Sequence, residues 1–493
     1  MKCIVLKDGN YFFSNNFIFK LMLNIHKNEF KKKNKTYFIQ KIKFIIIFLF
    51  LYYQRIIKFN ANSKLNELNK KYLEIQKSIK LKFHNKLNNK IRIGIYIYSL
   101  KNGGSQRLTS ILINYLYNLE IYDLFLFTIV PKNINEYYLS SNIWRTTVEE
   151  PRINNLIKLI IKNKLDILIY NLFDSTEIRI LKNLKNIKVI FYIHQSFLYW
   201  IYLNYISFKS LYKSYQNCSY IISLLPFEND YLFKKWGIKS IIMNNFITYQ
   251  FDSVIPSDLS SKIILMIGRC YDKLKRFELG VKAMKYIVHE EPKSVMKIIS
   301  IVDGTLFIQK LIIKLNLTNN IKFVGYTPQT EIYFKNASLH IFPSISESFG
   351  LVLCETKIYG IPNILIGLDY LSISKGGTII IYNDEPLSIA AEAIKILKNY
   401  KYRKNLGKKA RNSMKKYKNE VILMKWNKLI LTIYNGHDYY EKLRKNDKKI
   451  TKSEALNIFN NQIKLLKIRK PIFKNITINN IFNFTYMENL SIK

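Results

Sequence analysis

Apolar residues in the middle of this chain gather in short runs, separated by longer segments with helical spacing. The runs are rich in Ile, Leu, Phe and Tyr and hold few charges, which is typical of strands buried on both faces of a sheet. Strands that alternate with helices predict parallel sheets. We expect strands at 91–98, 124–130, 167–170, 188–192, 220–225, 262–267, 296–301, 321–324, 339–342, 363–366 and 378–381.

The alternation of strands and helices stops and then restarts, which indicates two α/β halves. Residues 245–261 contain Pro256 and few charges, so this segment is the expected linker. The fold class that follows is α/β, with two Rossmann-like domains facing across a cleft and helical extensions at both ends. The expected parts are a basic N-terminal extension (1–90), a first domain (91–250), a second domain (251–435) and a charged, Asn-rich tail (436–493). Expected helices are 108–119, 277–288, 387–397, 401–417 and 421–434.

The N-terminal extension contains an uninterrupted apolar block at 44–53, about half of what a membrane span requires. Basic residues flank it on both sides. The block is either an interfacial or marginal signal anchor, or a buried helix that packs on the first domain. Residues 65–79 have the spacing of an amphipathic helix, which packs on its own protein or on a partner. A membrane contact through residues 1–60 therefore stays open.

The charge balance is strongly basic, with 78 Lys and Arg against 34 Asp and Glu and a net charge of +44. Such a balance is typical of proteins that bind nucleic acid or anionic membranes. Here Lys, Asn, Ile, Tyr and Phe are all enriched together, these residues share AT-rich codons, and the lysines are spread along the chain. We therefore expect no nucleic-acid partner.

The cysteines show no metal-binding spacing, and each lies in or beside an apolar stretch. Reduced thiols in a cytoplasmic protein, free or on the cytosolic face of a membrane, are expected. The four positions are Cys3, Cys218, Cys270 and Cys354.

The most informative stretch is residues 344–362, Ser-Ile-Ser-Glu-Ser-Phe-Gly-Leu-Val-Leu-Cys-Glu-Thr-Lys-Ile-Tyr-Gly-Ile-Pro. Glu347 and Glu355 lie on either side of a Ser-Phe-Gly turn. An apolar strand precedes the turn, and a short apolar helix that stops at Gly360 follows it. The first turn of a helix binds anions because its backbone N–H groups are unpaired. An anion site between two hydroxyl-binding carboxylates suits a nucleotide-sugar diphosphate.

Further loops follow the carboxyl ends of expected strands. Gly103 and Gly104 open a helix, either as a structural turn or as a phosphate loop, but the third glycine of the dinucleotide fingerprint is absent. Arg269 and Lys275 follow the first strand of the second half and suit a diphosphate. His194 follows the strand 188–192, as a structural histidine or as a ligand. Because open α/β sheets bind ligands at this edge, these loops together predict a cleft between the halves.

With these motifs the chain resembles the retaining glycosyltransferases of group 1 (family 4), which have the GT-B fold. The resemblance covers roughly residues 91–435, and its most specific part is the motif from Glu347 to Glu355. The Gly-Gly loop and the Gly-Arg…Lys element are also similar. Trp426 in the last expected helix fits as well, because in this fold that helix usually crosses back onto the first domain.

The resemblance implies a role for each motif. Glu347 would contact hydroxyls of the transferred sugar and His194 would lie near the carbon that reacts, so these two are the candidate catalytic residues. Arg269 and Lys275 would bind the donor diphosphate, and Glu355 would bind the ribose. The remaining expected donor-binding residues are Ser348, Phe349, Gly350, Leu351, Gly103 and Gly104.

The chain departs from the family pattern in the cation loop. Lys275 lies one position further from Arg269 than is usual, so Lys273 remains an alternative phosphate ligand. The resemblance implies no metal and no cofactor, since fixed cations take the place of a metal. It implies transfer of a sugar, with retention of configuration, from a nucleotide-diphosphate donor to a glycan, lipid-linked or protein acceptor. The alternative is a non-catalytic sugar-nucleotide-binding or scaffold protein, because fold does not determine function.

Overall fold

The structure is a computed structural model, and the chain divides into two units that are described separately, Met1–Leu87 and Asn88–Lys493. In the first unit, β1 (Ile4–Val5) pairs antiparallel with β2 (Tyr11–Phe12). The expected helices at 44–53 and 65–79 lie outside the described residues. The structure describes residues 4–5, 11–12, 90–101, 103–196, 208–229, 236–300, 305–325, 327, 329–436, 453, 457 and 460.

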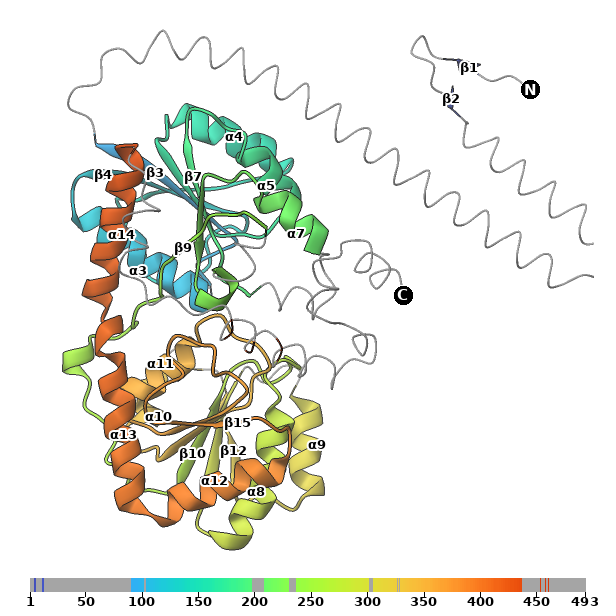
Figure 1. The fold of residues 1–493 in the computed structure, drawn as a ribbon, viewed down its shortest axis with the longest axis vertical. Coiled ribbons are helices and arrows are strands. Elements are labelled where there is room, and N and C mark those ends of the chain that lie inside the picture. Colours follow the sequence, from blue (N-terminus) through green and yellow to red (C-terminus); the bar gives the residue numbers. More distant parts are fainter. Residues whose placement is uncertain are drawn as a thin grey trace, which may run out of the picture. The chain divides into compact units, whose positions relative to one another are not determined.

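The first sheet of the second unit is entirely parallel (Figure 1). Its strand order is β5-β4-β3-β6-β7-β8-β9. The central strands are buried on both faces, which explains their uninterrupted apolar sequences. The strands are β3 (Ile91–Ile97), β4 (Tyr122–Thr128), β5 (Trp144–Thr147), β6 (Ile167–Tyr170), β7 (Lys188–Tyr192), β8 (Tyr220–Ser223) and β9 (Ile241–Ile242).

The second sheet is also parallel and has the order β12-β11-β10-β13-β14-β15. Both sheets are doubly wound, so the expected α/β fold class with two Rossmann-like domains is confirmed. The strands are β10 (Ile263–Ile267), β11 (Val295–Ile299), β12 (Ile321–Phe323), β13 (Leu339–Phe342), β14 (Asn363–Ile366) and β15 (Thr378–Ile381).

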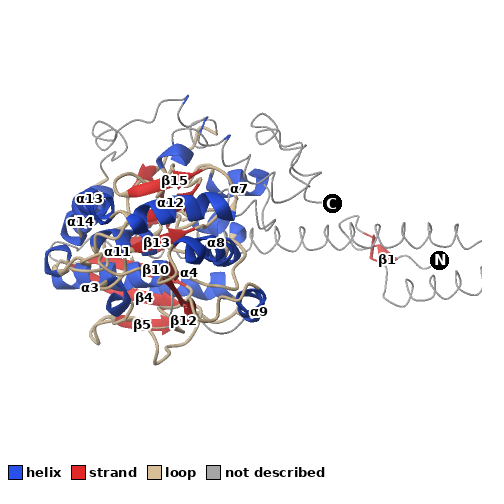
Figure 2. Cartoon of the chain, turned by 90° about the horizontal axis from the view of Figure 1, so that it is seen from below, coloured by secondary structure: helices blue, strands red, loops and turns tan. Residues whose placement is uncertain are grey.

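Helices connect the parallel strands (Figure 2), and local sequence explains several of their ends. The Asp174 side chain accepts hydrogen bonds from the backbone N–H groups of Thr176 and Glu177 at the start of α5. Pro386 opens α12, where its fixed φ suits the first turn. The helices are α3 (Gly104–Asn118), α4 (Arg152–Lys162), α5 (Ser175–Leu181), α7 (Phe208–Tyr215), α8 (Phe277–Glu290), α9 (Leu306–Lys314), α10 (Glu331–Phe334), α11 (Leu351–Ile358), α12 (Pro386–Lys398), α13 (Tyr400–Met414) and α14 (Asn419–Tyr434). Within the described ranges, no helix combines the length and hydropathy of a membrane span.

Within the two parallel sheets, two strands were not expected from the sequence. β5 reads Trp-Arg-Thr-Thr and lies at the edge of its sheet, so it lacks the apolar run that marks the central strands. β9 has only two residues at the opposite edge. Edge strands of this kind leave too weak a periodic signal to be recognised.

The strand order places the expected ligand loops in each sheet. In the first sheet the chain runs outward from β3 to β5 and then returns to β6 on the other side of β3. In the second sheet it runs from β10 to β12 and returns to β13. The loops after β3 and β6, and those after β10 and β13, therefore diverge at a switch point, which is where doubly wound sheets bind ligands.

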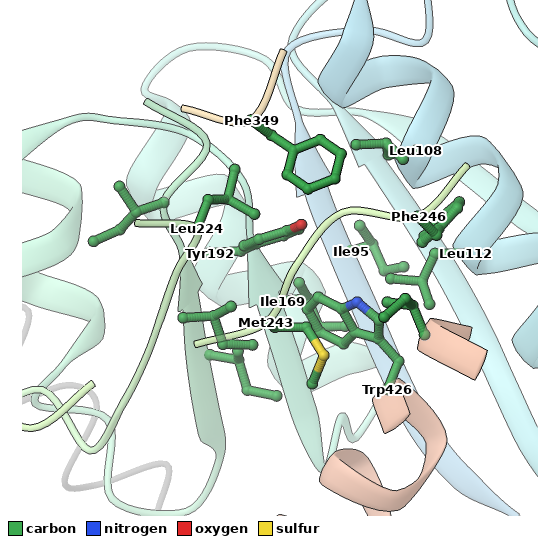
Figure 3. Packing of buried hydrophobic residues seen from close by; sticks show 14 of the residues in the cluster. Ile95, Leu108, Leu112, Ile169, Tyr192, Leu224, Met243, Phe246, Phe349 and Trp426 are labelled. Carbon is green, nitrogen blue, oxygen red and sulfur yellow. The ribbon is translucent and has the colours of Figure 1, made fainter. Parts of the chain in front are cut away.

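Helix α14, the last one whose bounds the structure describes, joins the second domain to the core of the first. Trp426 of α14 is 1% exposed and packs edge-on against Tyr192 at the end of β7, with ring centroids 5.0 Å apart. Figure 3 shows Trp426 and Phe349, from the turn before α11, in the cluster that contains Ile95 of β3. One hydrophobic cluster thus includes residues of both domains.

Replacing Trp426 with Ala should destabilise the protein by about 3–5 kcal/mol, the usual cost of removing a buried aromatic side chain. The matched control is Met424→Ala on the same helix, where a side chain that is 59% exposed should contribute less than about 0.5 kcal/mol. Denaturant unfolding of the full chain measures both values. Equal effects of the two substitutions would contradict this role for Trp426.

Candidate functional site

The two carboxylates of the motif lie within a strand–turn–helix unit, Glu347 in the turn and Glu355 in the helix. β13 is buried along its whole length and ends at Phe342, and α11 begins at Leu351. Gly350 precedes the helix with φ 83° and ψ 68°, a left-handed conformation that glycine adopts without strain. Gly360, with φ 70°, lies just beyond the end of the helix. The first turn of α11 therefore presents backbone N–H groups that have no acceptor within the helix.

Glu347 lies in the turn and is held at both its backbone and its side chain. The Tyr370 hydroxyl accepts a hydrogen bond from the Glu347 N–H at 3.0 Å and donates one to the Glu347 carbonyl at 3.1 Å. The Lys275 ammonium forms an ion pair with the Glu347 carboxylate. The structure thus brings an expected phosphate ligand directly to the expected sugar ligand.

The other two cations of the loop after β10 are placed differently. The Arg269 side chain is 55% exposed and forms its ion pair with Asp272 at 3.1 Å. Lys273 is exposed. The loop is anchored instead by the buried Arg276, which the sequence did not single out and which donates to the Pro343 carbonyl at 2.6 Å. Of the two lysines proposed as phosphate ligands, Lys275 is therefore the one that contacts the motif.

Glu355 is buried in α11 and contacts segments that are far away in the sequence. Arg107 of α3 donates from Nη1 to the Glu355 carboxylate at 2.8 Å, and the Thr248 hydroxyl donates to the same oxygen at 3.0 Å. Arg107 also stacks over the Tyr249 ring, with its guanidinium carbon 4.8 Å from the ring centroid. Burial raises the pKa of the Glu355 carboxyl, while Arg107 and Thr248 act in the opposite direction.

The glycine loop of the first domain lies against the start of α11. A Cβ atom added at Gly104 would lie 2.6 Å from Leu351 Cδ1, so the two elements approach closely here. Gly103 immediately precedes α3, and its carbonyl accepts from the Arg107 N–H at 3.0 Å. Two N-terminal helix ends, those of α3 and α11, therefore lie on either side of this contact.

Of the remaining residues of the turn, Phe349 packs in the core and Ser348 is more accessible. Phe349 is 2% exposed and packs edge-on against Tyr417, with ring centroids 5.6 Å apart. Ser348 is half-buried beside Glu347. The Phe349 side chain thus anchors the turn in the core, so only its backbone is suited to contact a phosphate.

His194 follows β7, at the same edge of the first sheet. Its Nε2 lies 2.9 Å from the side-chain oxygen of Asn171, which follows β6. Burial lowers the pKa of His194 to about 3, so the imidazole is neutral at neutral pH. A neutral imidazole can exchange hydrogen bonds with sugar hydroxyls, but it offers no positive charge to a phosphate. No contact in the described structure joins His194 to Glu347 or Lys275.

A cavity of about 430 Å³ opens at the carboxyl ends of β4 and β5. Most of its lining residues lie within 131–150 of the first domain. Its lining combines apolar side chains with charges of both signs, including an ion pair between Arg152 and Glu150 at 2.9 Å. The full lining is Ile129, Pro131, Thr147, Val148, Glu149, Glu150 and Arg152.

Some site residues were missed by reasoning from sequence. Arg107 stands in the glycine loop, but its partner Glu355 lies 248 residues further along, and no local pattern links them. Tyr370 lies after β14 in a segment without a motif. The described residues contain no group of His, Cys, Asp and Glu that could hold a metal ion.

Comparison with known proteins agrees with this geometry. Residues 250–413 match the family model "Glycosyl transferases group 1". A curated relative, N-acetyl-alpha-D-glucosaminyl L-malate synthase of Bacillus anthracis, is 29% identical over 198 residues, which are 38% of this chain and 47% of the relative. The chain thus spans about half the length of that relative.

Solved structures with a similar fold are much more distant in sequence. Sucrose-phosphate synthase of Thermosynechococcus elongatus is 15% identical with a TM-score of 0.60, over 70% of this chain and 100% of that one. TarM of S. aureus is 14% identical with a TM-score of 0.58, over 71% and 100%. HepE of Anabaena, solved with UDP and glucose, is 13% identical with a TM-score of 0.56, over 69% and 99%. With two doubly wound sheets and the site at their switch points, this chain has the GT-B fold, and its residues 250–413 resemble the glycosyl transferases of group 1.

Proposed function

We propose that this protein is a retaining, metal-independent glycosyltransferase that moves a sugar from a nucleotide-diphosphate donor to a hydroxyl-bearing acceptor. The observation that carries the proposal is the ion pair between Lys275 and Glu347 beside the first turn of α11. It puts a cation for the diphosphate, a carboxylate for the sugar hydroxyls and helix N–H groups for phosphate oxygens in one place. These are the groups that the donor's two chemically distinct parts require.

Different residues of the site then bind different parts of the donor. Lys275, the first turn of α11 and the loop at Gly103 and Gly104 bind the diphosphate, and Arg269 joins them from its exposed position. Glu355 accepts hydrogen bonds from the ribose hydroxyls. Arg107 favours the ionised form of Glu355 and fixes its carboxylate, and is therefore a further residue of the proposed donor site. Glu347 and His194 contact the transferred sugar.

The proposed mechanism follows from the negative charge that develops on the leaving diphosphate. The bond between the sugar C1 and the diphosphate oxygen breaks, and the leaving diphosphate keeps the electron pair. Lys275 and the helix N–H groups stabilise the added negative charge, so that no metal is required. The acceptor oxygen forms its bond to C1 on the face that the diphosphate leaves, and its proton passes to the departing phosphate oxygen. No further cofactor takes part.

We place the acceptor, a glycan or a lipid-linked molecule, toward the cavity at the carboxyl ends of β4 and β5. The described cysteines, Cys218, Cys270 and Cys354, are free, which suits a cytoplasmic enzyme. Attachment to the cytosolic face of a membrane through residues 1–60 is part of the proposal, and sedimentation with anionic vesicles tests it.

The direct test is release of nucleotide from a panel of nucleotide sugars by the purified full chain. UDP sugars come first, because HepE and TarM were solved with UDP. Release that continues in the presence of a chelator supports the metal-independent reaction. Anomeric analysis of the product by NMR decides between retention and inversion.

The alternative is a protein that binds the nucleotide sugar without turning it over. It predicts that a nucleotide diphosphate raises the melting temperature while no donor releases nucleotide with any acceptor fraction. Absence of both binding and release would contradict the proposed function and its alternative together.

Substitutions of the two carboxylates should change different kinetic constants. Glu347→Gln should lower kcat by about 10²-fold or more, because Glu347 acts on the sugar as the bond breaks. Glu355→Gln should mainly raise the KM for the donor, because it weakens ribose binding in both the ground state and the transition state. Steady-state kinetics of nucleotide release measures both constants.

The matched control for these two variants is Glu420→Gln, an exposed carboxylate on α14 that should leave both constants unchanged. Melting temperatures show whether each variant is folded. Full activity of a folded Glu347→Gln enzyme would show that the site is wrongly assigned.

The two lysines of the cation loop offer a second contrast. Lys275→Met should reduce kcat/KM for the donor by about 10²-fold, because it removes the cation beside the diphosphate. Lys273→Met, two positions away and exposed, should change it by less than about threefold, since exposed charges are strongly screened. If Lys273→Met has the larger effect, Lys273 is the phosphate ligand.

A further inference from the structure

Helix α11 contains a lysine that the proposed chemistry does not use. Lys357 lies two residues after Glu355, and none of its surface is exposed. Burying an ammonium is costly unless it is fully hydrogen-bonded. Burial lowers the pKa of Lys357 to about 7; Cys354 acts in the opposite direction, and the neighbouring Lys416 acts in the same direction as burial. A surface role for this lysine is therefore excluded.

The Lys357 ammonium donates to two backbone carbonyls of the loop that joins β14 to β15, the 367–377 loop. One is the carbonyl of Ile373, and the other is that of Lys375, at 2.7 Å. Because the donor is charged, these hydrogen bonds are stronger than neutral ones. The C-terminal end of α11 thus holds the 367–377 loop through these hydrogen bonds.

Hydrogen bonds between its own residues connect the parts of the 367–377 loop to one another. The Ser374 hydroxyl donates to the Asp369 carbonyl at 2.8 Å, and the Ser374 N–H donates to the Leu371 carbonyl at 3.0 Å. From outside the loop, the Tyr417 hydroxyl donates to the Ser372 carbonyl at 2.6 Å. The carbonyls that Lys357 holds are therefore coupled to the preceding turn.

That turn carries Tyr370, whose hydroxyl holds Glu347 by its backbone. Tyr370 is 4% exposed, and its ring packs edge-on against Phe227 of the first domain, with centroids 5.1 Å apart. Its hydroxyl bonds both the N–H and the carbonyl of Glu347. A residue clamped at both backbone groups cannot rotate its peptide planes, so the direction of its side chain is restricted.

We propose that Lys357 and Tyr370 are positioning residues that set the direction of the Glu347 carboxylate through the 367–377 loop. Lys357 holds the loop, the loop holds Tyr370, and Tyr370 holds the Glu347 backbone. Neither residue touches the donor. This inference rests on the proposed function for its effect on catalysis, but the structural linkage can be tested without any substrate.

The test uses Lys357→Met, Tyr370→Phe and the double variant in the full chain. Amide hydrogen exchange, read by mass spectrometry, follows the peptides that cover 345–350 and 368–376. Lys357→Met should speed exchange in both segments. Tyr370→Phe should speed it in 345–350 alone, because only the hydroxyl that accepts from the Glu347 N–H is lost. The matched control is Lys408→Met, an exposed lysine on α13, which should alter neither segment.

Kinetics with the best donor adds a readout that a purely structural role would not move. Each single variant should lower kcat by about tenfold, with a smaller change in the KM for the donor, because the donor-binding groups stay in place. The double variant should lose no more than the larger single loss, because both substitutions break one linkage. Two losses that multiply would show independent roles and would overturn the proposal.

The remaining outcomes also decide the matter. Lys357→Met could melt at a lower temperature and yet keep the exchange at 345–350 and the kcat of the parent protein. Lys357 would then have a structural role only. If Lys357→Met does not fold, Tyr370→Phe alone is decisive, and unchanged exchange and kcat in that variant contradict the proposal. If the parent protein releases no nucleotide from any donor, the proposed function fails, but the exchange data still test the linkage.

Discussion

The position of the site depends on one constraint, namely that each sheet begins in its middle and reverses direction once. β3 and β6 are neighbours in the first sheet, as are β10 and β13 in the second. The loops after neighbouring strands that lead to opposite sides of the sheet separate and leave room for a ligand. Apart from the cavity at the ends of β4 and β5, the site residues described above lie on or beside such a loop, or on an element packed against it, such as α3, α11 or the 367–377 loop. The polar groups could change with little effect on this geometry, whereas a change of strand order would remove it.

Within that space the charges are arranged in pairs. Glu347 is paired with Lys275 from the same domain, and Glu355 with Arg107 from the other domain. An unpaired carboxylate buried like Glu355 would tend to protonate, since burial raises its pKa. The Arg107 guanidinium keeps it available as an acceptor for hydroxyls. It also makes the proposed ribose site depend on both domains at once.

Much of the fold could be predicted from the sequence, because apolar runs flanked by turns mark strands that are buried on both faces. The predicted strands 167–170, 188–192, 339–342, 363–366 and 378–381 match the observed ones at both ends. The strands β5 and β9 could not be predicted, because β5 reads Trp-Arg-Thr-Thr and β9 has only two residues, so neither forms an apolar run that stands out in the sequence. Motif residues of the site could be named because they are close together along the chain. Arg107 as the partner of Glu355, and Tyr370 as the clamp on Glu347, depend on folding and carry no local signal.

The lysines show that burial, and not composition, indicates which charges contribute to the site. A chain with a net charge of +44 has so many lysines that their number in any loop carries no information. Lys273 and Lys275 stand two positions apart, yet one is exposed and the other pairs with Glu347. Lys357 resembles any other lysine in the sequence, but it is buried against backbone carbonyls. Since a charge acts strongly only where water is excluded, the lysines that matter are those for which the fold supplies a partner and removes the solvent.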